Sequence, residues 1–175
     1  MLKMLGFIFL NGDSMKIVGL RNCDITEELF KLNLPFQILN GDLIATEKHI
    51  LHAINQAKSK EPITKSFWME ILVRASAQRQ ISNAIEVIGA KVGKGRNICI
   101  VCPDDDALNK ILKYVGGEID NSVLELNPKK IEEIKKIYNI KGSCEYDSKN
   151  NTLNEEYKEN LIKRVCEKIS LIEIL

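Results

Sequence analysis

Residue types and motifs that commonly build active sites are scarce in this chain of 175 residues. It contains two histidines and one tryptophan, and it has no G-x-x-x-x-G-K-[ST] phosphate loop, no G-x-G-x-x-G before a helix and no G-x-S-x-G elbow. The usual nucleotide-binding and serine-hydrolase signatures are therefore excluded. The net charge of +1 also excludes a uniformly basic coat for nucleic acid. We expect a protein without catalytic residues, a bound metal or a cofactor.

The composition that remains is that of an ordinary soluble globular protein, with 45% hydrophobic and 28% charged residues. The apolar run Met1–Leu10 is shorter than the roughly 20 residues that span a bilayer, and Asn11–Ser14 offers no signal-peptide cleavage site. We interpret residues 1–14 as an N-terminal extension that comes from an upstream start codon or forms an additional edge strand. The expected location is cytoplasmic.

Five cysteines form an odd set, of which only Cys99 and Cys102 have the spacing of a metal or redox pair. Both fall in Ile98–Cys102, a continuous apolar run typical of a buried strand. Residues three apart in a strand point to opposite faces, so the two thiols would diverge. The prediction is that these are core cysteines.

Strand-like and helix-like periodicities alternate along the chain and predict an α/β fold of the mixed α+β kind. Strands are expected at Lys16–Arg21, Phe36–Leu39 and Ile98–Cys102. Helices are expected at Thr26–Leu32, after a Thr46 cap, at Phe67–Ala75, at Ile81–Ile88 with Gly89 as C-cap, from Asp104 to Gly116, after Pro128, and at Glu155–Ile169. No linker or repeat divides the chain. Residues 15–175 are therefore predicted to form a single helix-rich domain packed around a small central sheet.

Two groups of polar residues could in principle hold a metal ion. His49 and His52 lie one helical turn apart, but the sequence indicates no third ligand. This favours two histidines that hydrogen-bond within the protein or face water. Asp104-Asp105-Asp106 offers oxygen ligands, although carboxylates at a helix start also satisfy free N–H groups and complement the helix dipole. A small metal-dependent enzyme that uses Asp104–Asp106 therefore stays an alternative.

Charge is distributed unevenly along the chain. Residues 58–96 carry eight basic and three acidic side chains, a net +5, which leaves −4 for the remainder. Such an excess is an electrostatic footprint for a phosphate backbone, but a solvated lysine-rich face fits it equally well. Within this segment, Gly93–Arg96 would expose backbone N–H groups that could bind an anion.

The expected helix junction concentrates amide and guanidinium groups. It reads Arg74-Ala75-Ser76-Ala77-Gln78-Arg79-Gln80-Ile81. Such groups can bind base edges and phosphates together. The alternative is an ordinary capping junction, in which Ser76 caps while Gln78 and Gln80 face water.

Between Glu70 and Gly89 the chain contains Glu70-Ile71-Leu72, Arg79-Gln80-Ile81, Ala84-Ile85 and Gly89. With these residues the block resembles the PRPK-binding protein (TPRKB-type) family, the small kinase-binding subunits of the KEOPS complex. The resemblance extends from about Met15 to the C-terminal residues, and the family commonly has a glycine where this chain has Ala77.

The resemblance implies a non-catalytic accessory subunit. Family members bind and regulate the small atypical kinase/ATPase of KEOPS, which contacts the threonylcarbamoyl-transferase subunit. Together they modify the adenosine next to the anticodon in tRNAs that read ANN codons, and the family is associated with binding the single-stranded 3′ CCA end of tRNA. The motif match implies tRNA contacts at Arg74, Gln78, Arg79 and Gln80, to which the charge distribution adds Lys91, Lys94 and Arg96. A stand-alone cytoplasmic RNA-binding module is the second alternative.

Apolar residues continue beyond the last helical stripe, in Ser170–Leu175. Leu171, Ile172, Ile174 and Leu175 give this tail more apolar surface than one helix face buries. We expect them to form part of the kinase-docking surface. The alternative is a last turn packed into the protein's own core.

Overall fold

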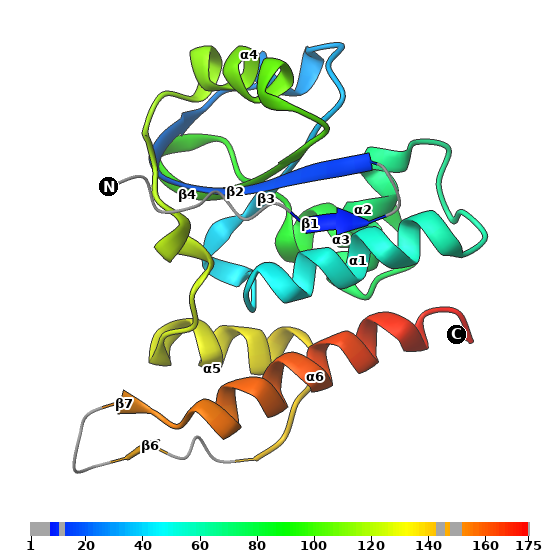
Figure 1. Ribbon diagram of the computed structural model, residues 1–175, viewed down its shortest axis with the longest axis vertical. Helices are drawn as coiled ribbons and strands as arrows, with labels where there is room; N and C mark the ends of the chain where they lie inside the picture. The colour runs from blue at the N-terminus through cyan, green and yellow to red at the C-terminus, as the bar shows by residue number, and fades with distance from the viewer. Residues whose placement is uncertain (1–7, 11–12, 143–145, 148–151, 175) are drawn as a thin grey trace. The chain divides into compact units, whose positions relative to one another are not determined.

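The computed structural model describes residues 8–10, 13–142, 146–147 and 152–174 (Figure 1). These residues form helices and one main antiparallel sheet, which confirms the predicted mixed α/β class. They divide into two compact units, the first from residues up to Asp42 together with Gly89–Leu124, and the second from Leu43–Ile88 together with Glu125–Leu175. No helix in the described ranges combines the length and hydropathy needed to cross a membrane. The single domain at residues 15–175 stays a prediction.

The first unit is built on a sheet with strand order β1-β2-β4-β3. Its strands are β1 (Ile8–Leu10), β2 (Asp13–Ile25), β3 (Gln37–Asn40) and β4 (Gly93–Cys102), with β5 (Glu118–Ile119) pairing β2. All pairings are antiparallel, and β1 is the edge strand expected within the N-terminal extension.

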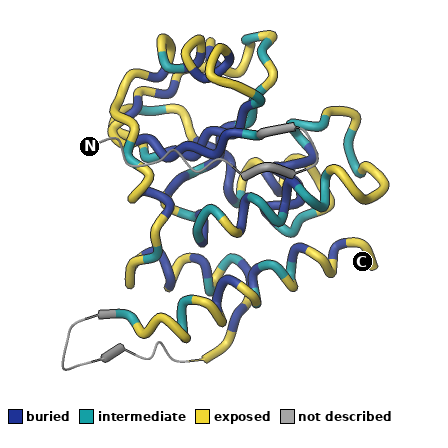
Figure 2. Tube along the Cα trace, viewed as in Figure 1, coloured by how far each residue is buried: buried dark blue, intermediate teal, exposed yellow. Residues whose placement is uncertain are grey.

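The core of the first unit is centred on β2 and β4. Ile98–Cys102 is buried throughout, which is why this strand reads as a continuous apolar run rather than an alternating one (Figure 2). Cys99 and Cys102 are both fully buried, as predicted for core cysteines. Burial also raises the pKa of the Cys102 thiol to about 11, so this sulfur stays protonated and unreactive at neutral pH.

Helix α4 (Asp105–Val115) packs on the sheet of the first unit. Asp104 caps it by accepting a hydrogen bond from the Ala107 N–H at 2.8 Å. Gly116, with φ +58°, ends it in a conformation that a side chain would disfavour. Both ends of this helix are therefore encoded by the local sequence. A short 3-10 helix, η3 (Asn121–Leu124), follows.

The second unit is mainly helical. It contains α1 (Glu47–Ser59), α2 (Phe67–Ser76), α3 (Ile81–Ile88), α5 (Pro128–Ile137), α6 (Glu155–Leu171) and the small hairpin β6 (Tyr146–Asp147) and β7 (Thr152–Leu153). The predicted α6 stripe is confirmed, because Leu161, Val165 and Ile169 are buried in a cluster with residues of α5.

Three local predictions were wrong. Thr26–Leu32 forms only the 3-10 turn η1 (Leu29–Lys31), because so short a segment adds too few hydrogen bonds to offset the cost of helix nucleation. Thr46 precedes α1 without a side-chain cap, and its hydroxyl is buried without a partner among the described residues. Gly89 follows α3 but does not adopt the left-handed conformation of a C-cap, and it forms an isolated antiparallel β-bridge with Leu39 instead.

A further 3-10 turn, η2 (Gly41–Leu43), follows β3.

Candidate functional site

The junction between α2 and α3 is a tight turn centred on Ala77. Ala77 has φ +53° and ψ +31°, the left-handed conformation that glycine adopts without strain. The Ser76 hydroxyl donates to the Val73 carbonyl at 2.8 Å and accepts from the Gln78 N–H at 3.2 Å. Ser76 therefore closes the end of α2, as the capping alternative predicted, and α3 begins after a sharp change of direction.

A buried polar cluster fixes the last turn of α2 from inside the second unit. His49 Nδ1 accepts a hydrogen bond from the Ala45 N–H at 3.1 Å, so its Nε2 carries the proton and donates to the Ala75 carbonyl at 2.8 Å. The Tyr138 hydroxyl donates to the same carbonyl at 2.5 Å. Burial lowers the pKa of His49 to about 4, although the bond to Ala75 opposes this shift. The imidazole is therefore neutral at pH 7.

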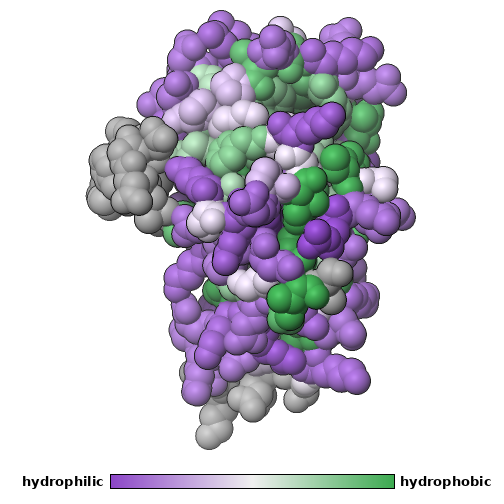
Figure 3. All heavy atoms as spheres, turned by 90° about the vertical axis from the view of Figure 1, so that its right-hand side faces the viewer, coloured by the Kyte–Doolittle hydropathy of each residue, from purple (hydrophilic) through white to green (hydrophobic). Residues whose placement is uncertain are grey.

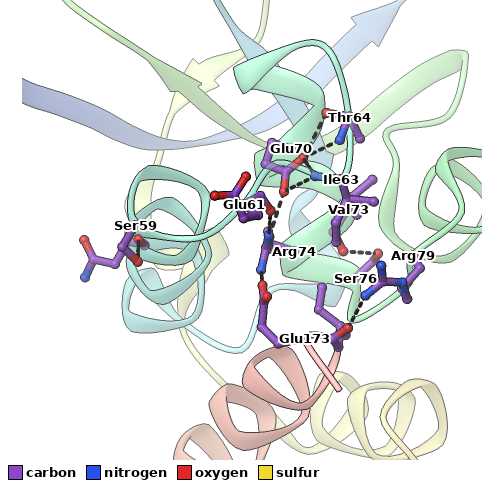
Figure 4. Close-up of polar contacts among 12 residues, drawn as sticks. Ser59, Glu61, Ile63, Thr64, Glu70, Val73, Arg74, Ser76, Arg79 and Glu173 are labelled. Carbon is purple, nitrogen blue, oxygen red and sulfur yellow. Dashed lines mark hydrogen bonds and ion pairs between the residues drawn. The ribbon is translucent and has the colours of Figure 1, made fainter. Parts of the chain in front are cut away.

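Arg74 lies at the centre of a second buried cluster (Figure 4). Its Nε donates to Glu70 at 2.8 Å, its Nη2 donates to the Glu61 carbonyl at 2.8 Å, and its Nη1 pairs with Glu173 of the C-terminal tail. Glu70 also accepts from the N–H groups of Ile63 and Thr64. Burial by itself would raise the pKa of Glu70, but these donors together hold it below its ordinary value.

This geometry corrects the interpretation of Arg74 as a tRNA contact. The Arg74 side chain is fully buried and its guanidinium is occupied by protein oxygens, so a phosphate or base has no access to it. A guanidinium rarely stays buried unless its charge is paired, and Glu70 and Glu173 provide that pairing. Arg74 is instead a structural residue of the second unit.

Arg79 lies on the surface at the junction and contacts the C-terminal tail. Its Nη1 donates to the Ile172 carbonyl at 2.5 Å (Figure 4). Arg79 is exposed as a residue, and within the part of the chain that the structure describes its Nε and Nη2 have no protein acceptor. Gln80 is also exposed and Gln78 is half-buried. These three polar side chains, unlike Arg74, are placed where an external ligand can reach them.

The tail residues expected at the kinase interface differ in their exposure to solvent. Leu171 and Ile174 are 44% and 79% exposed, so they are free to meet a partner. Ile172 is fully buried, which corrects its assignment: it packs into the protein's own core, as the alternative held. Leu175 lies outside the described residues. Figure 3 shows hydrophobic side chains gathered in distinct areas on one face of the molecule, among hydrophilic ones.

The remaining predicted tRNA contacts belong to the first unit. Lys91, Lys94 and Arg96 are exposed, at and before the start of β4. The segment is a strand rather than an open anion-binding loop, because Gly93 and Arg96 pair with β2. The Gly95 N–H donates to Asp24 at 3.3 Å. The exposed backbone donors expected here are therefore partly used within the protein.

The two candidate metal groups have protein partners. Asp104 caps α4, Asp105 pairs with Lys16 at 2.6 Å, and Asp106 pairs with Lys110 at 2.7 Å. His52 contacts the Ser170 hydroxyl at 2.9 Å. The described residues contain no cluster of three or more histidine, cysteine or acidic side chains arranged for a metal ion. The carboxylates thus act as helix-start residues and ion-pair partners.

Comparison of the sequence with known proteins shows the family to which the chain belongs. Residues 20–173 match the family described as "Kinase binding protein CGI-121". The chain belongs to the CGI-121 family. It is also 52% identical over 160 residues to the protein named "Regulatory protein Cgi121" from Methanocaldococcus jannaschii, an alignment that covers 91% of this chain and 98% of that protein. The predicted resemblance to the kinase-binding subunit family is confirmed.

The exposure of two residues near the junction and one long-range ion pair were not predicted from the sequence. Ile81 and Ile85 of α3 are 42% and 43% exposed although they fit an apolar helical stripe. Glu173 was not singled out, because its partner Arg74 is 99 residues away in the sequence. Phe67 and Trp68, the aromatic residues of α2, lie in its first turn, roughly 12–14 Å along the helix from the junction. They are therefore not stacking partners for a base at Arg79.

Proposed function

We propose that this CGI-121 family member is a non-catalytic accessory subunit of the KEOPS complex. It binds and regulates the small atypical kinase/ATPase, which contacts the threonylcarbamoyl-transferase subunit, and it helps to recruit tRNA through the 3′ CCA end for threonylcarbamoyladenosine modification in the cytoplasm. The family match supports the kinase partner. The observation that carries the proposal at residue level is the Arg79–Ile172 hydrogen bond, which joins the two predicted binding segments.

The kinase-docking surface comprises exposed apolar side chains of the tail and of α3. Ile172 is buried and anchors the tail, while Leu171 and Ile174 on either side of it are exposed to solvent. Ile81 and Ile85 stand one turn apart at the start of α3, close in sequence to Arg79. Exposed apolar residues on ordered segments are the usual core of a protein interface.

A binding assay with the purified kinase tests this surface. Ile174→Ser, alone and with Leu171→Ser, should weaken kinase binding about tenfold or more, because truncation of central apolar anchors removes most interface energy. Phe30→Ser is the matched control, since Phe30 is 51% exposed on the first unit and lies outside the proposed surface. Equal affinity of the tail variants and the wild type would exclude the tail from the interface.

The RNA-binding surface comprises Gln78, Arg79 and Gln80, which offer guanidinium and amide groups to phosphates and base edges. On the first unit, Lys91, Lys94 and Arg96 are exposed basic side chains that favour binding to phosphates in general. Arg74 is excluded from this set because it is buried. Base recognition through polar groups suits a single-stranded end, whose bases are open to hydrogen bonding.

Titration with a tRNA, with and without its terminal CCA, at two salt concentrations tests the RNA surface. Loss of binding on removal of the three nucleotides, and about a tenfold loss in Arg79→Glu, are expected. Lys163→Glu is the control, because Lys163 is an exposed lysine of α6 and the charge change is the same. Salt-sensitive binding that ignores the CCA end would leave only a nonspecific basic face. Retained tRNA binding without any kinase association would favour the stand-alone RNA-binding module.

A further inference from the structure

The C-terminal tail is held by two arginines from the same junction. Arg74 pairs with Glu173, and Arg79 donates to the carbonyl of the adjacent residue, Ile172. Because Arg74 lies three residues before Ala77 and Arg79 two residues after it, the two bonds clamp consecutive tail residues from both sides of the turn. The burial of Ile172 completes this attachment. We refer to Ile172 and Glu173, held in this way, as the clamped tail.

The clamp also acts on Arg79. An exposed arginine normally samples many rotamers, and a ligand that binds it must restrict them at an entropic cost. The carbonyl of Ile172 occupies only Nη1, and a guanidinium has five N–H donors in a fixed fork. Nε and Nη2 have no hydrogen bond within the described residues, so they remain for an external oxygen while the bond to the tail restricts the rotamers of Arg79. The bond to the tail prepares Arg79 for a ligand rather than competing with one.

We propose that the clamped tail is a positioning element of the RNA site, and that kinase docking on the tail and RNA binding at Arg79 strengthen each other. This inference rests on the proposed function. Docking on Leu171 and Ile174 restricts the tail, which steadies the Ile172 carbonyl and hence Arg79. RNA bound to Arg79 restricts the same elements in return, because coupling between two binding equilibria is reciprocal.

A substitution at Glu173 separates positioning from plain electrostatics. Glu173 carries negative charge near the proposed RNA site, so its removal should tighten RNA binding if charge alone matters. If the tail positions Arg79, Glu173→Ala should weaken binding of a tRNA ending in CCA about threefold to fivefold. Glu173→Gln keeps an oxygen acceptor for Arg74 and should restore most of the affinity. Glu167→Ala, an exposed acid on α6, is the charge-matched control and should bind as tightly as wild type or more tightly.

The coupling itself is measured by titrating the same tRNA with and without saturating kinase. The expected result is about a fivefold gain in tRNA affinity with kinase for the wild type, and a gain below twofold for Glu173→Ala and Arg79→Lys. Thermal unfolding of each variant confirms that the binding measurements use folded protein. Full affinity in Glu173→Ala, or a wild-type affinity that kinase leaves unchanged, overturns the inference. A wild type that binds no tRNA, alone or with kinase, overturns the proposed function itself.

Discussion

The Nη1 atom of Arg79 donates a hydrogen bond to the backbone carbonyl of Ile172, 93 residues further along the chain. This contact joins the polar junction between α2 and α3 to the apolar tail after α6. From the sequence, the junction was predicted to bind tRNA and the tail was predicted to bind the kinase, as two separate sites. Their direct contact means that a change in either segment is expected to alter the other, which guides the interpretation of variants at both.

Replacement of Ala77 by glycine should stabilise the protein. Ala77 adopts φ +53°, a conformation that costs an L-residue with a Cβ atom about 1 kcal/mol or more, whereas glycine adopts it freely. Part of this gain is offset by the greater freedom of glycine in the unfolded chain. The expected net effect is about 0.5 kcal/mol in urea unfolding. Ala57→Gly, inside α1, should instead destabilise by about 1 kcal/mol, and destabilisation by Ala77→Gly would contradict the strain argument.

Loss of the Arg74 charge should be strongly destabilising. Arg74→Met leaves the Glu70 carboxylate buried without its guanidinium partner, and breaking a buried ion pair costs about 3–5 kcal/mol. The double variant Glu70→Gln with Arg74→Met removes both charges and should recover part of that loss. Chemical denaturation of both proteins gives the comparison. An effect of Arg74→Met below about 1 kcal/mol would show that the ion pair is not needed for the fold.

Acid should weaken the fold through His49. The pKa of His49 in the folded protein is about 4, well below the value of 6.5 expected when unfolded. The unfolded chain therefore binds a proton first, so stability is complete above pH 6.5 and declines as the pH falls towards 4. Between pH 7.5 and 4.5 the expected loss from His49 is about 2–3 kcal/mol.

Urea unfolding at the two pH values measures this loss. His49→Gln removes the titrating group and should flatten most of the pH dependence. The pKa of His52 is also lowered by burial, so His52→Gln is the control for the smaller contribution in the same direction. A pH dependence unchanged in His49→Gln would assign acid sensitivity to other groups.

The acidic residues before α4 should behave as structural residues and not as metal ligands. Asp104→Ala removes the cap on the Ala107 N–H and should cost about 1 kcal/mol of unfolding free energy. Asp106→Ala loses only an exposed ion pair with Lys110 and should cost less than about 0.5 kcal/mol. Melting temperatures with magnesium or a chelator should agree. A rise with magnesium that Asp106→Ala abolishes would revive the metal-dependent enzyme.

Much of the local structure could be predicted from the sequence. The apolar run Ile98–Cys102 indicated a buried strand, the cap at Asp104 indicated a helix start, and the spacing of Leu161, Val165 and Ile169 indicated the buried face of α6. Each signal depends on residues a few positions apart, where backbone geometry alone decides which side chains share a face. The family resemblance likewise came from a short continuous block.

Only the tertiary structure decided which polar and apolar residues are available for binding. Arg74 and Arg79 occur in similar sequence surroundings. Arg74 is nevertheless buried and paired with Glu70 and Glu173, whereas Arg79 is on the surface. Ile172 is buried while its neighbour Leu171 is exposed. These outcomes depend on contacts between residues more than 90 positions apart, and no local periodicity encodes such contacts. Burial of a charged group requires a partner from elsewhere in the chain, and folding alone brings that partner into place.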